Sequence, residues 1–327
     1  MDTLLLNGND VRKLLGMDEC IRAVEEAFRL RALGQTDAPG ILGIHAKEGG
    51  FHIKAGILNL GRSYFAAKTN ANFPKNPMKN GLPTIQGVMV VSDAHDGRLL
   101  ALMDSIEITI IRTGAATAVA AKHLANPDAK TVTIIGCGNQ GRISLRALKS
   151  VRNIQKAFVF DLDQRVTENF ATAMREELNI AVEPVDDFKN ALAVSDICVT
   201  CTPSKQPFIK RDHIRPGTFV AAVGSDNAEK QELDPALLIG NKLVADSLAQ
   251  ASTIGELHHA LKANVVRIQD VHAELGEVIA GLKQGRTSKD DIIIFDSTGT
   301  ALQDVAAAAI VYEKAINASV STFAFSQ

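Results

Sequence analysis

The feature that most constrains the fold is an alternation of strand-like and helix-like segments over the second half of the chain. From residue 131 onward, apolar runs such as TVTIIG, AFVFD, DICVTCT and DIIIFDS alternate with helical stretches such as NQGRISLRALKSV and QRVTENFATAMREEL. Strands that alternate with helices form βαβ units, and their parallel sheet is covered on both faces. We therefore predict an α/β domain built on a doubly wound parallel sheet over residues 114–303.

The turn after the first of these strands has a phosphate-binding pattern. Gly136, Gly138 and Gly141 form G-x-G-x-x-G between the strand TVTII and the following helix. The first glycine permits a tight bend, the second lets the backbone approach a pyrophosphate, and the third lets helix and strand pack closely. The next strand ends in Asp161, 20 residues after Gly141, where a carboxylate binds a ribose 2′-hydroxyl and repels a 2′-phosphate. The pattern predicts a Rossmann domain that binds NAD in preference to NADP, although Arg165 lies nearby; a purely structural turn is the alternative.

The first third of the chain has a different texture. A helix is predicted over residues 17–34, with Asp18 as its N-cap and Gly34 as its end, because apolar residues recur on one helical face. From about residue 40 to 111, short apolar runs are broken by Gly, Asn and Pro. This texture predicts a second, β-rich α+β domain over residues 1–113, with mainly antiparallel strands.

Two further helices are predicted at the junctions of these domains. The Ala- and Thr-rich segment 112–125 is expected to be a close-packed helix that joins the β-rich part to the parallel sheet. The apolar segment TALQDVAAAAIVYEKAI predicts a helix near the end of the chain, and we expect residues 304–327 to return to the first domain as that helix.

Composition excludes several classes of function. The 35 basic and 37 acidic side chains are dispersed along the chain, and the net charge of -2 offers no basic surface for a nucleic acid. No run without a charged residue exceeds 13 residues, whereas a membrane-spanning helix needs about 20 apolar residues. The N-terminal residues lack the pattern of a secretory signal, so a cytoplasmic location is expected.

The cysteines and histidines do not favour a metal or redox site. Cys198 and Cys201 form a C-x-x-C pair, but the surrounding Ile, Val and Thr residues predict a strand, on which positions three apart point to opposite faces. The adjacent His258 and His259 lack ligand spacing, and zinc needs three or four convergent ligands. We therefore favour a buried strand over a redox pair and expect no metal.

Candidate chemical groups in the β-rich domain are basic residues in apolar or Gly/Asn-rich settings: His52, Lys54, Lys68 and Arg112. Lys68 follows an apolar strand, and burial would lower the pKa of its amine and provide an acid or base near neutral pH; a lysine that reaches from a strand end into solvent is the alternative. Arg112 lies in apolar company and needs a carboxylate partner, which is either a substrate or Asp104 or Glu107.

In the parallel-sheet domain, Asp226 lies just beyond the strand TFVAAVG. Ligands of open α/β sheets bind at the carboxyl ends of the strands, so this carboxylate is placed to orient a water or to stabilise a cationic imine. Capping of the following turn explains it equally well. Thr202 and Ser297 follow other predicted strands at the same edge.

Six short motifs occur in a fixed order along the chain. K-x-N at Lys68, L-P-T, R-T-G-A-A-T and G-x-G-x-Q are followed by V-G-x-D-x-x-x-K-x-E-L and I-F-D-S-T-G. In this combination the chain resembles the ornithine cyclodeaminase and mu-crystallin family over essentially its whole length. Within that family it looks most like the archaeal-type alanine dehydrogenases.

The resemblance implies a homodimer joined through the β-rich domain, with NAD bound by the Rossmann domain. It implies that Lys68 and Asp226 form the catalytic pair and that Arg112 holds the substrate carboxylate. Family members usually have another carboxylate-binding arginine on an early strand, but this chain reads GGFHIKAGIL there, so His52 or Lys54 would replace it. The resemblance implies these cofactor-site residues: Thr84, Thr113, Gly136, Gly138, Asn139, Gln140, Gly141, Asp161, Thr202, Val223, Gly224, Lys230 and Ser297.

The activity implied by the resemblance is that of an NAD-dependent L-amino-acid dehydrogenase or, in the reverse direction, an imine reductase. Its substrate would be a small 2-amino acid, or a 2-oxo acid with ammonia or an amine. Two alternatives stay open. One is a cyclodeaminase-type ammonia lyase that uses NAD catalytically, and the other is a ketimine reductase or a non-catalytic binding protein of the mu-crystallin kind.

Overall fold

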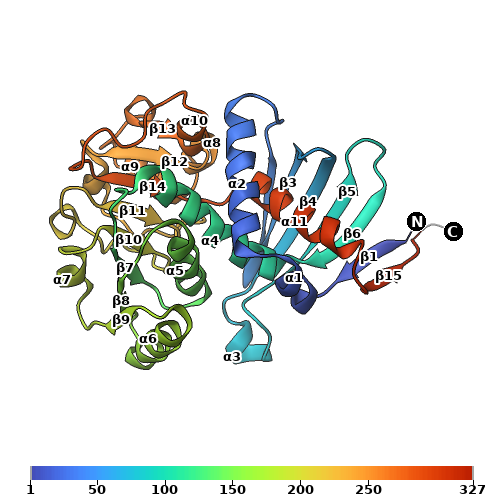
Figure 1. Cartoon of the computed structure of the whole chain (residues 1–327), viewed down its shortest axis with the longest axis horizontal. Coiled ribbons are helices and arrows are strands. Elements are labelled where there is room, and N and C mark those ends of the chain that lie inside the picture. Colours follow the sequence, from blue (N-terminus) through green and yellow to red (C-terminus); the bar gives the residue numbers. More distant parts are fainter. Residues whose placement is uncertain (1, 326–327) are drawn as a thin grey trace. The chain divides into compact units, whose positions relative to one another are not determined.

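The computed structural model describes residues 2–325, and this part of the chain forms two compact units (Figure 1). Unit 1 contains the described residues up to Arg112 and those from Thr300 onward, and unit 2 is Thr113–Gly299. Among the described residues, no helix has the length and apolar character needed to cross a bilayer.

In the described part of the chain, unit 1 is built on a seven-stranded sheet of order β15-β1-β6-β5-β4-β3-β2. The pairs are antiparallel except for β1 with β6. The strands are β1 (Thr3–Leu6), β2 (Gly40–Ala46), β3 (Gly49–Asn59), β4 (Ser63–Asn72), β5 (Ile85–Asp93), β6 (Leu99–Asp104) and β15 (Ser321–Phe323). The helices are α1 (Gly8–Leu14), α2 (Met17–Ala32), α3 (Asn76–Asn80), α11 (Ala301–Ala315) and the first part of α4 (Ser105–Leu124).

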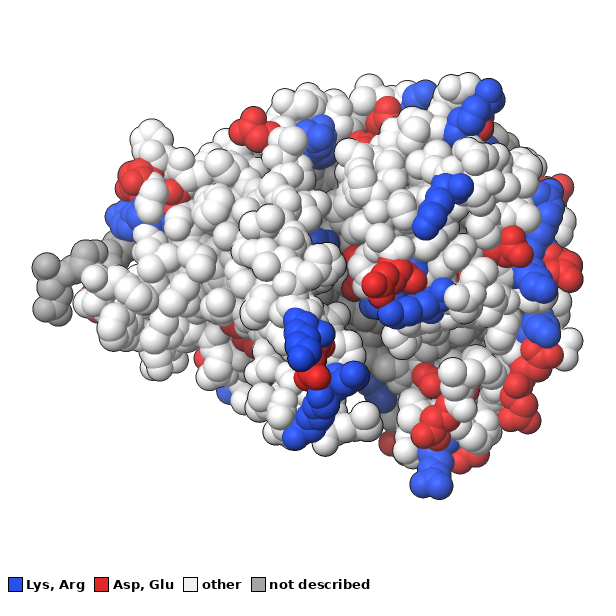
Figure 2. All heavy atoms as spheres, turned by 180° about the vertical axis from the view of Figure 1, so that it is seen from behind, with Lys and Arg blue, Asp and Glu red and all other residues white. Residues whose placement is uncertain are grey.

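The two faces of this sheet differ. Helix α11 packs on β3 and β4 and against α2, and it covers one face (Figure 1). Side chains alternate along a strand, so buried residues such as Leu58, Tyr64 and Met89 point toward α11. The opposite face carries exposed apolar side chains and few charged ones (Figure 2); they include Leu42, Ile44, Phe51, Ile57 and Val88.

Three predictions in unit 1 need correction. Helix α2 begins at Met17, but its N-cap is Gly16, and Asp18 lies inside the first turn. There its negative charge still interacts favourably with the positive end of the helix dipole. Helix α4 begins at Ser105 rather than at 112, because the Asp104 carboxylate accepts hydrogen bonds from the N–H groups of the first turn. The predicted terminal helix ends at Ala315, well before 325, and β15 follows it and pairs with β1; residues 326–327 lie outside the described part.

Unit 2 contains, among the described residues, an eight-stranded parallel sheet of order β13-β12-β14-β11-β10-β7-β8-β9. The strands are β7 (Thr131–Ile135), β8 (Lys156–Phe160), β9 (Ala181–Pro184), β10 (Ile197–Thr200), β11 (Phe219–Ala222), β12 (Lys242–Ala245), β13 (Ala273–Glu274) and β14 (Ile293–Asp296). The helices are α5 (Asn139–Val151), α6 (Gln164–Leu178), α7 (Phe188–Leu192), α8 (Leu248–Ala251), α9 (Gly255–Lys262), α10 (Leu275–Ile279) and three 3-10 turns, η1 (Arg211–His213), η2 (Pro235–Leu238) and η3 (Ile268–Asp270).

The strand order of unit 2 is that of a Rossmann domain. In the order β9-β8-β7-β10-β11, the strands before β10 are added on one side of β7 and the later ones on its other side. Open α/β sheets bind ligands at such a switch point in the strand order. The predicted α/β fold with a second, β-rich domain is thus confirmed. The C-x-x-C pair also follows the strand prediction, since Cys198 is buried in β10 and Cys201 lies just beyond it, both as free thiols.

Candidate functional site

The glycine turn of unit 2 has the geometry that its sequence predicts. Gly136 has a φ of +102°, and a Cβ there would lie 2.9 Å from the carbonyl oxygen of Cys201. A Cβ on Gly141 would collide with the carbonyl of Gly136, so strand β7 and helix α5 approach closely at this point. A Cβ on Gly138 would meet nothing within 4 Å. Gly136 and Gly141 are therefore required by packing, whereas Gly138 opens onto free space.

The start of α5 beside Gly138 is suited to an anion. Gly138 is the N-cap and supplies no side-chain acceptor for the first amide groups of the helix, which carry the positive end of the helix dipole. The Oε1 atom of Gln140, in this first turn, is buried and has no hydrogen-bond partner. The free amides and the open space together fit the diphosphate of a dinucleotide, whereas the Gln140 oxygen is an acceptor and cannot bind the phosphate oxygens.

Asp161 is held beside this turn. It follows β8, and its Oδ2 atom accepts a hydrogen bond of 2.8 Å from the N–H of Cys137, within the glycine turn. Its Oδ1 atom receives only a long contact of 3.4 Å from the N–H of Asp163, and the residue is partly exposed. The carboxylate therefore keeps acceptor capacity for a sugar hydroxyl.

Four of the predicted cofactor residues follow neighbouring strands of the same sheet. Thr202 follows β10, Val223 and Gly224 follow β11, and Ser297 follows β14. The backbone N–H of Ser297 donates to the carbonyl of Ala222 at 2.9 Å, which joins the ends of β14 and β11. The structure thus gathers these residues along the carboxyl edge of unit 2.

Asp226 lies on the loop after β11, and its side chain is 53% exposed. Lys230 donates from Nζ to its Oδ1 atom at 2.8 Å, so the two predicted site residues form an ion pair. The loop thus presents the Asp226 carboxylate, paired with Lys230, at the carboxyl edge of unit 2.

In unit 1, Lys68 belongs to a buried cluster of polar groups. Its side chain is 4% exposed, and Nζ lies 2.7 Å from Oδ2 of Asp304 on α11 and donates to Oγ1 of Thr109 at 3.2 Å. Arg112 on α4 donates from Nε to Oδ1 of the same Asp304 at 2.8 Å and from Nη1 to Oε1 of Gln303 at 3.0 Å. Asp304 therefore bridges the two cations that the sequence singles out.

This arrangement shifts the pKa values of Lys68 and Asp304. Burial lowers the pKa of Lys68 to about 7; Asp304 opposes this change, while the charges of Arg112 and Lys54 add to it. For Asp304, burial alone would raise the pKa, but Lys68 and Arg112 hold it below its usual value. An amine with a pKa near 7 exchanges a proton readily at neutral pH.

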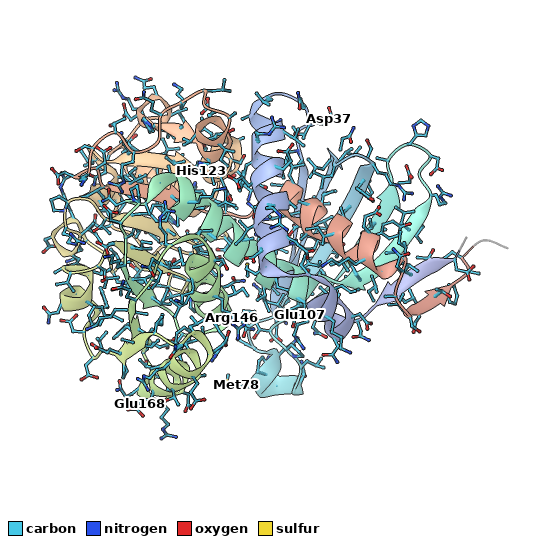
Figure 3. All side chains as sticks on the ribbon, in the orientation of Figure 1. Asp37, Met78, Glu107, His123, Arg146 and Glu168 are labelled. Carbon is cyan, nitrogen blue, oxygen red and sulfur yellow. The ribbon has the colours of Figure 1, made fainter. Side chains whose placement is uncertain are left out.

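Within the chain, the carboxylate that pairs with Arg112 is neither Asp104 nor Glu107 but Asp304. Glu107, labelled in Figure 3, pairs with Arg12, and Asp104 caps α4. Asp304 lies 192 residues from Arg112 in the sequence, so reasoning from sequence neighbours missed it. The available signal was the polar pair Q-D within the apolar helix TALQDVAAAAIV.

The remaining predicted residues lie on other parts of the two units. Lys54 stands opposite Lys68 in the β3–β4 register and so shares its face, as does His52 opposite Asn70. Thr84 lies in unit 1, where its carbonyl accepts the N–H of Phe73 at 2.8 Å. Thr113 is buried in α4 at the first position of unit 2. In the described residues, no group of His, Cys, Asp or Glu side chains has the geometry of a metal site.

The sequence profile of the ornithine cyclodeaminase/mu-crystallin family matches residues 1–319. The chain belongs to this family. Within it, alanine dehydrogenase of Archaeoglobus fulgidus is 39% identical over 323 residues, which cover 98% of each chain.

Two solved structures of the family are similar to this chain over nearly all its length. An archaeal alanine dehydrogenase dimer with bound NAD has a TM-score of 0.95 and 40% identity, with 100% of both chains covered. The Δ1-pyrroline-2-carboxylate reductase of Thermococcus litoralis, in complex with NADH and L-proline, has a TM-score of 0.90 and 34% identity, with 98% of this chain and 100% of the other covered. Both family members bind a nicotinamide dinucleotide.

Proposed function

We propose that this protein is an NAD-dependent oxidoreductase that interconverts a small L-2-amino acid with its 2-oxo acid and ammonia, or reduces the corresponding imine. The buried Lys68 carries this proposal, because its amine has a pKa of about 7 and is held by Asp304 beside Arg112. The dehydrogenase and reductase activities of the relatives support the same reaction class.

Each residue proposed for substrate binding or catalysis has a chemical role. Arg112 would hold the substrate carboxylate, aided by Lys54 or His52, and so fix the Cα in position. Lys68 would donate a proton to, or accept one from, the groups attached to the substrate Cα while the imine is formed or hydrolysed. Asp226 would orient the water and favour the cationic imine. The chemistry that NAD supplies when bound is acceptance of the hydride from the substrate Cα.

We further propose that the cofactor is NAD rather than NADP. The glycine turn and the α5 N-terminus would hold the diphosphate, and Asp161 would bind the adenosine ribose. A 2′-phosphate would meet the carboxylate of Asp161, and two anions in contact repel each other.

The exposed face of the unit 1 sheet supports a homodimer. Leu42, Ile44, Phe51, Ile57 and Val88 are 39–53% exposed on that face, and contiguous apolar surface is uncommon on a monomer. A related alanine dehydrogenase is a dimer. We propose that two copies of this chain pack through this face.

A substrate screen tests the proposed activity. Pyruvate and other 2-oxo acids are offered with ammonia or methylamine, and the oxidation of NADH and NADPH is followed separately, with Lys68→Ala as the comparison variant. We expect NADH oxidation with one class of small 2-oxo acid and loss of turnover in Lys68→Ala. Conversion of ornithine to proline without net change in NADH, or full turnover in Lys68→Ala, would overturn the proposal.

A further inference from the structure

Glu232 in unit 2 lies outside the set of residues proposed for catalysis, substrate binding and cofactor binding. Its side chain is fully buried, and its carboxylate accepts four hydrogen bonds, which come from the last residue of β10, from the loop after β10 and from the loop after β11. Oε1 accepts from Thr200 Oγ1 at 2.6 Å, from the N–H of Thr202 at 2.6 Å and from Thr202 Oγ1 at 2.7 Å. Oε2 accepts from the N–H of Gly224 at 2.8 Å. One carboxylate thus joins the loop after β10 to the loop after β11.

The contact with Gly224 leaves no room for a side chain. A Cβ at this position would collide with Oε2 of Glu232 and with the carbonyl of Thr202. The glycine therefore permits the two loops to approach the carboxylate closely. Because all four contacts need an acceptor at Glu232, only a group with acceptors on both oxygens satisfies the site.

A second and a third buried carboxylate hold Glu232 in place. Glu256, at the start of α9, accepts the N–H groups of Glu232 at 2.8 Å and of Leu233 at 3.1 Å. Asp296, at the end of β14, accepts the N–H of Leu257 at 2.8 Å. Asp296 thus accepts from the backbone of the segment that carries Glu256, and Glu256 accepts from the backbone of the segment that carries Glu232. The ends of β14, β11 and β10 are connected in this way beneath the carboxyl edge of the sheet.

The three buried carboxylates depend on their hydrogen bonds. Burying ionisable groups is unfavourable unless hydrogen bonds compensate it, and burial does raise the pKa of Glu232 against the effect of its four donors. An apolar side chain would leave the donors of Thr202 and Gly224 unpaired. The carboxylate is therefore suited to fixing loop geometry.

We infer that Glu232 is a positioning residue for the nicotinamide half of the cofactor, acting through Thr202 and Gly224; this inference rests on the proposed function. In a Rossmann domain a dinucleotide lies across the switch point between β7 and β10. Asp161 and the glycine turn lie on the β8 side, which receives the adenosine half. The two loops joined by Glu232 follow β10 and β11, which lie on the opposite side of the switch point from β8. These loops are therefore placed to contact the nicotinamide half.

This assignment predicts a selective effect on binding. In Glu232→Gln the amide nitrogen replaces one acceptor, so the N–H of Gly224 or that of Thr202 loses its partner. We expect the Kd for NADH to rise about tenfold, a change typical of a lost buried hydrogen bond. The Kd for ADP, which lacks the nicotinamide half, should change less than twofold.

The experiment measures NADH and ADP binding to the full chain by calorimetry, with the thermal midpoint of each variant recorded beside it. Glu183→Gln, on the exposed ion pair with Lys156, is the matched control and should bind both ligands as the wild type does. If Glu232→Gln does not fold, Thr200→Val removes one donor to the same carboxylate, and we expect it to weaken NADH about threefold without affecting ADP.

The possible results separate the claims. Weaker NADH binding with unchanged ADP binding supports the positioning role. Unchanged NADH binding overturns it, and so does an equal loss of both ligands, which would indicate a general structural role. If the wild type binds neither ligand, the proposed function itself fails, and this inference fails with it.

Discussion

Asp304 should control the proton affinity of Lys68, and Asp304→Asn removes its charge with little change of shape. The two charged groups are 2.7 Å apart in a buried setting. Unit charges 4 Å apart attract by about 4 kcal/mol at an effective dielectric constant of about 20, and one pH unit corresponds to about 1.4 kcal/mol. Loss of the carboxylate should thus lower the pKa of Lys68 from about 7 by at least 1 and at most roughly 3.

The assay is the pH dependence of kcat/KM for oxidation of the amino acid that the substrate screen identifies. Lys68 must accept a proton in this direction, so wild-type activity should rise with pH through about 7. In Asp304→Asn the rise should occur at least one pH unit lower, whereas Asp18→Asn, on the exposed start of α2, should leave it in place. A rise within 0.3 pH units of the wild type, in a variant that folds, would refute the reasoning.

Three further predictions follow from the two units. Asp161→Asn should raise the kcat/KM ratio of NADPH to NADH at least tenfold, because an anion no longer opposes the 2′-phosphate; an unchanged ratio in steady-state kinetics would contradict the assignment. Phe51→Asp should convert the proposed dimer into a monomer in light scattering, whereas a dimer that persists would place the interface elsewhere. Burial raises the pKa of Asp296 from 3.8 to about 7 in the folded state, so its protonated form stabilises the fold below pH 4 and that stabilisation is lost as the pH rises to 7. This loss is at most about 4 kcal/mol, and chemical denaturation should show a flatter pH dependence in Asp296→Asn than in the wild type; equal slopes would count against the shifted pKa.

The parts of the fold that the sequence predicts best depend on local signals. The turn from Gly136 to Gly141 and the acid at 161 lie within one βαβ unit, so the spacing of the glycines and of Asp161 can be read directly along the sequence. Apolar runs in the parallel sheet are buried on both faces and therefore read clearly as strands. These signals need no knowledge of distant contacts.

The misses arise where a helix cap or a distant segment decides the outcome. Ile108, Thr109 and Ile111 favour a strand by propensity, but the cap at Asp104 and packing within unit 1 make them part of α4. Asp304 becomes a site residue only because α11 packs on β4. Its pairing with Lys68 on β4 joins residues that lie far apart in the sequence.

The role of Glu232 in joining the loops after β10 and β11 also depends on contacts between distant segments. Glu232 belongs to the K-x-E-L motif, but the sequence alone does not show that its carboxylate faces Thr202 and Gly224. Its burial and its four donors emerge only once β10 and β11 are neighbours in the sheet. Motifs thus locate the segments that matter, and the tertiary contacts identify the atoms.

The binding of NADH to the purified protein tests the central claim most directly. Calorimetry with the wild type should show one site per chain with a micromolar Kd, and binding should weaken at least tenfold in Asp161→Ala. The absence of measurable heat and of fluorescence change for both NADH and NADPH would contradict the account.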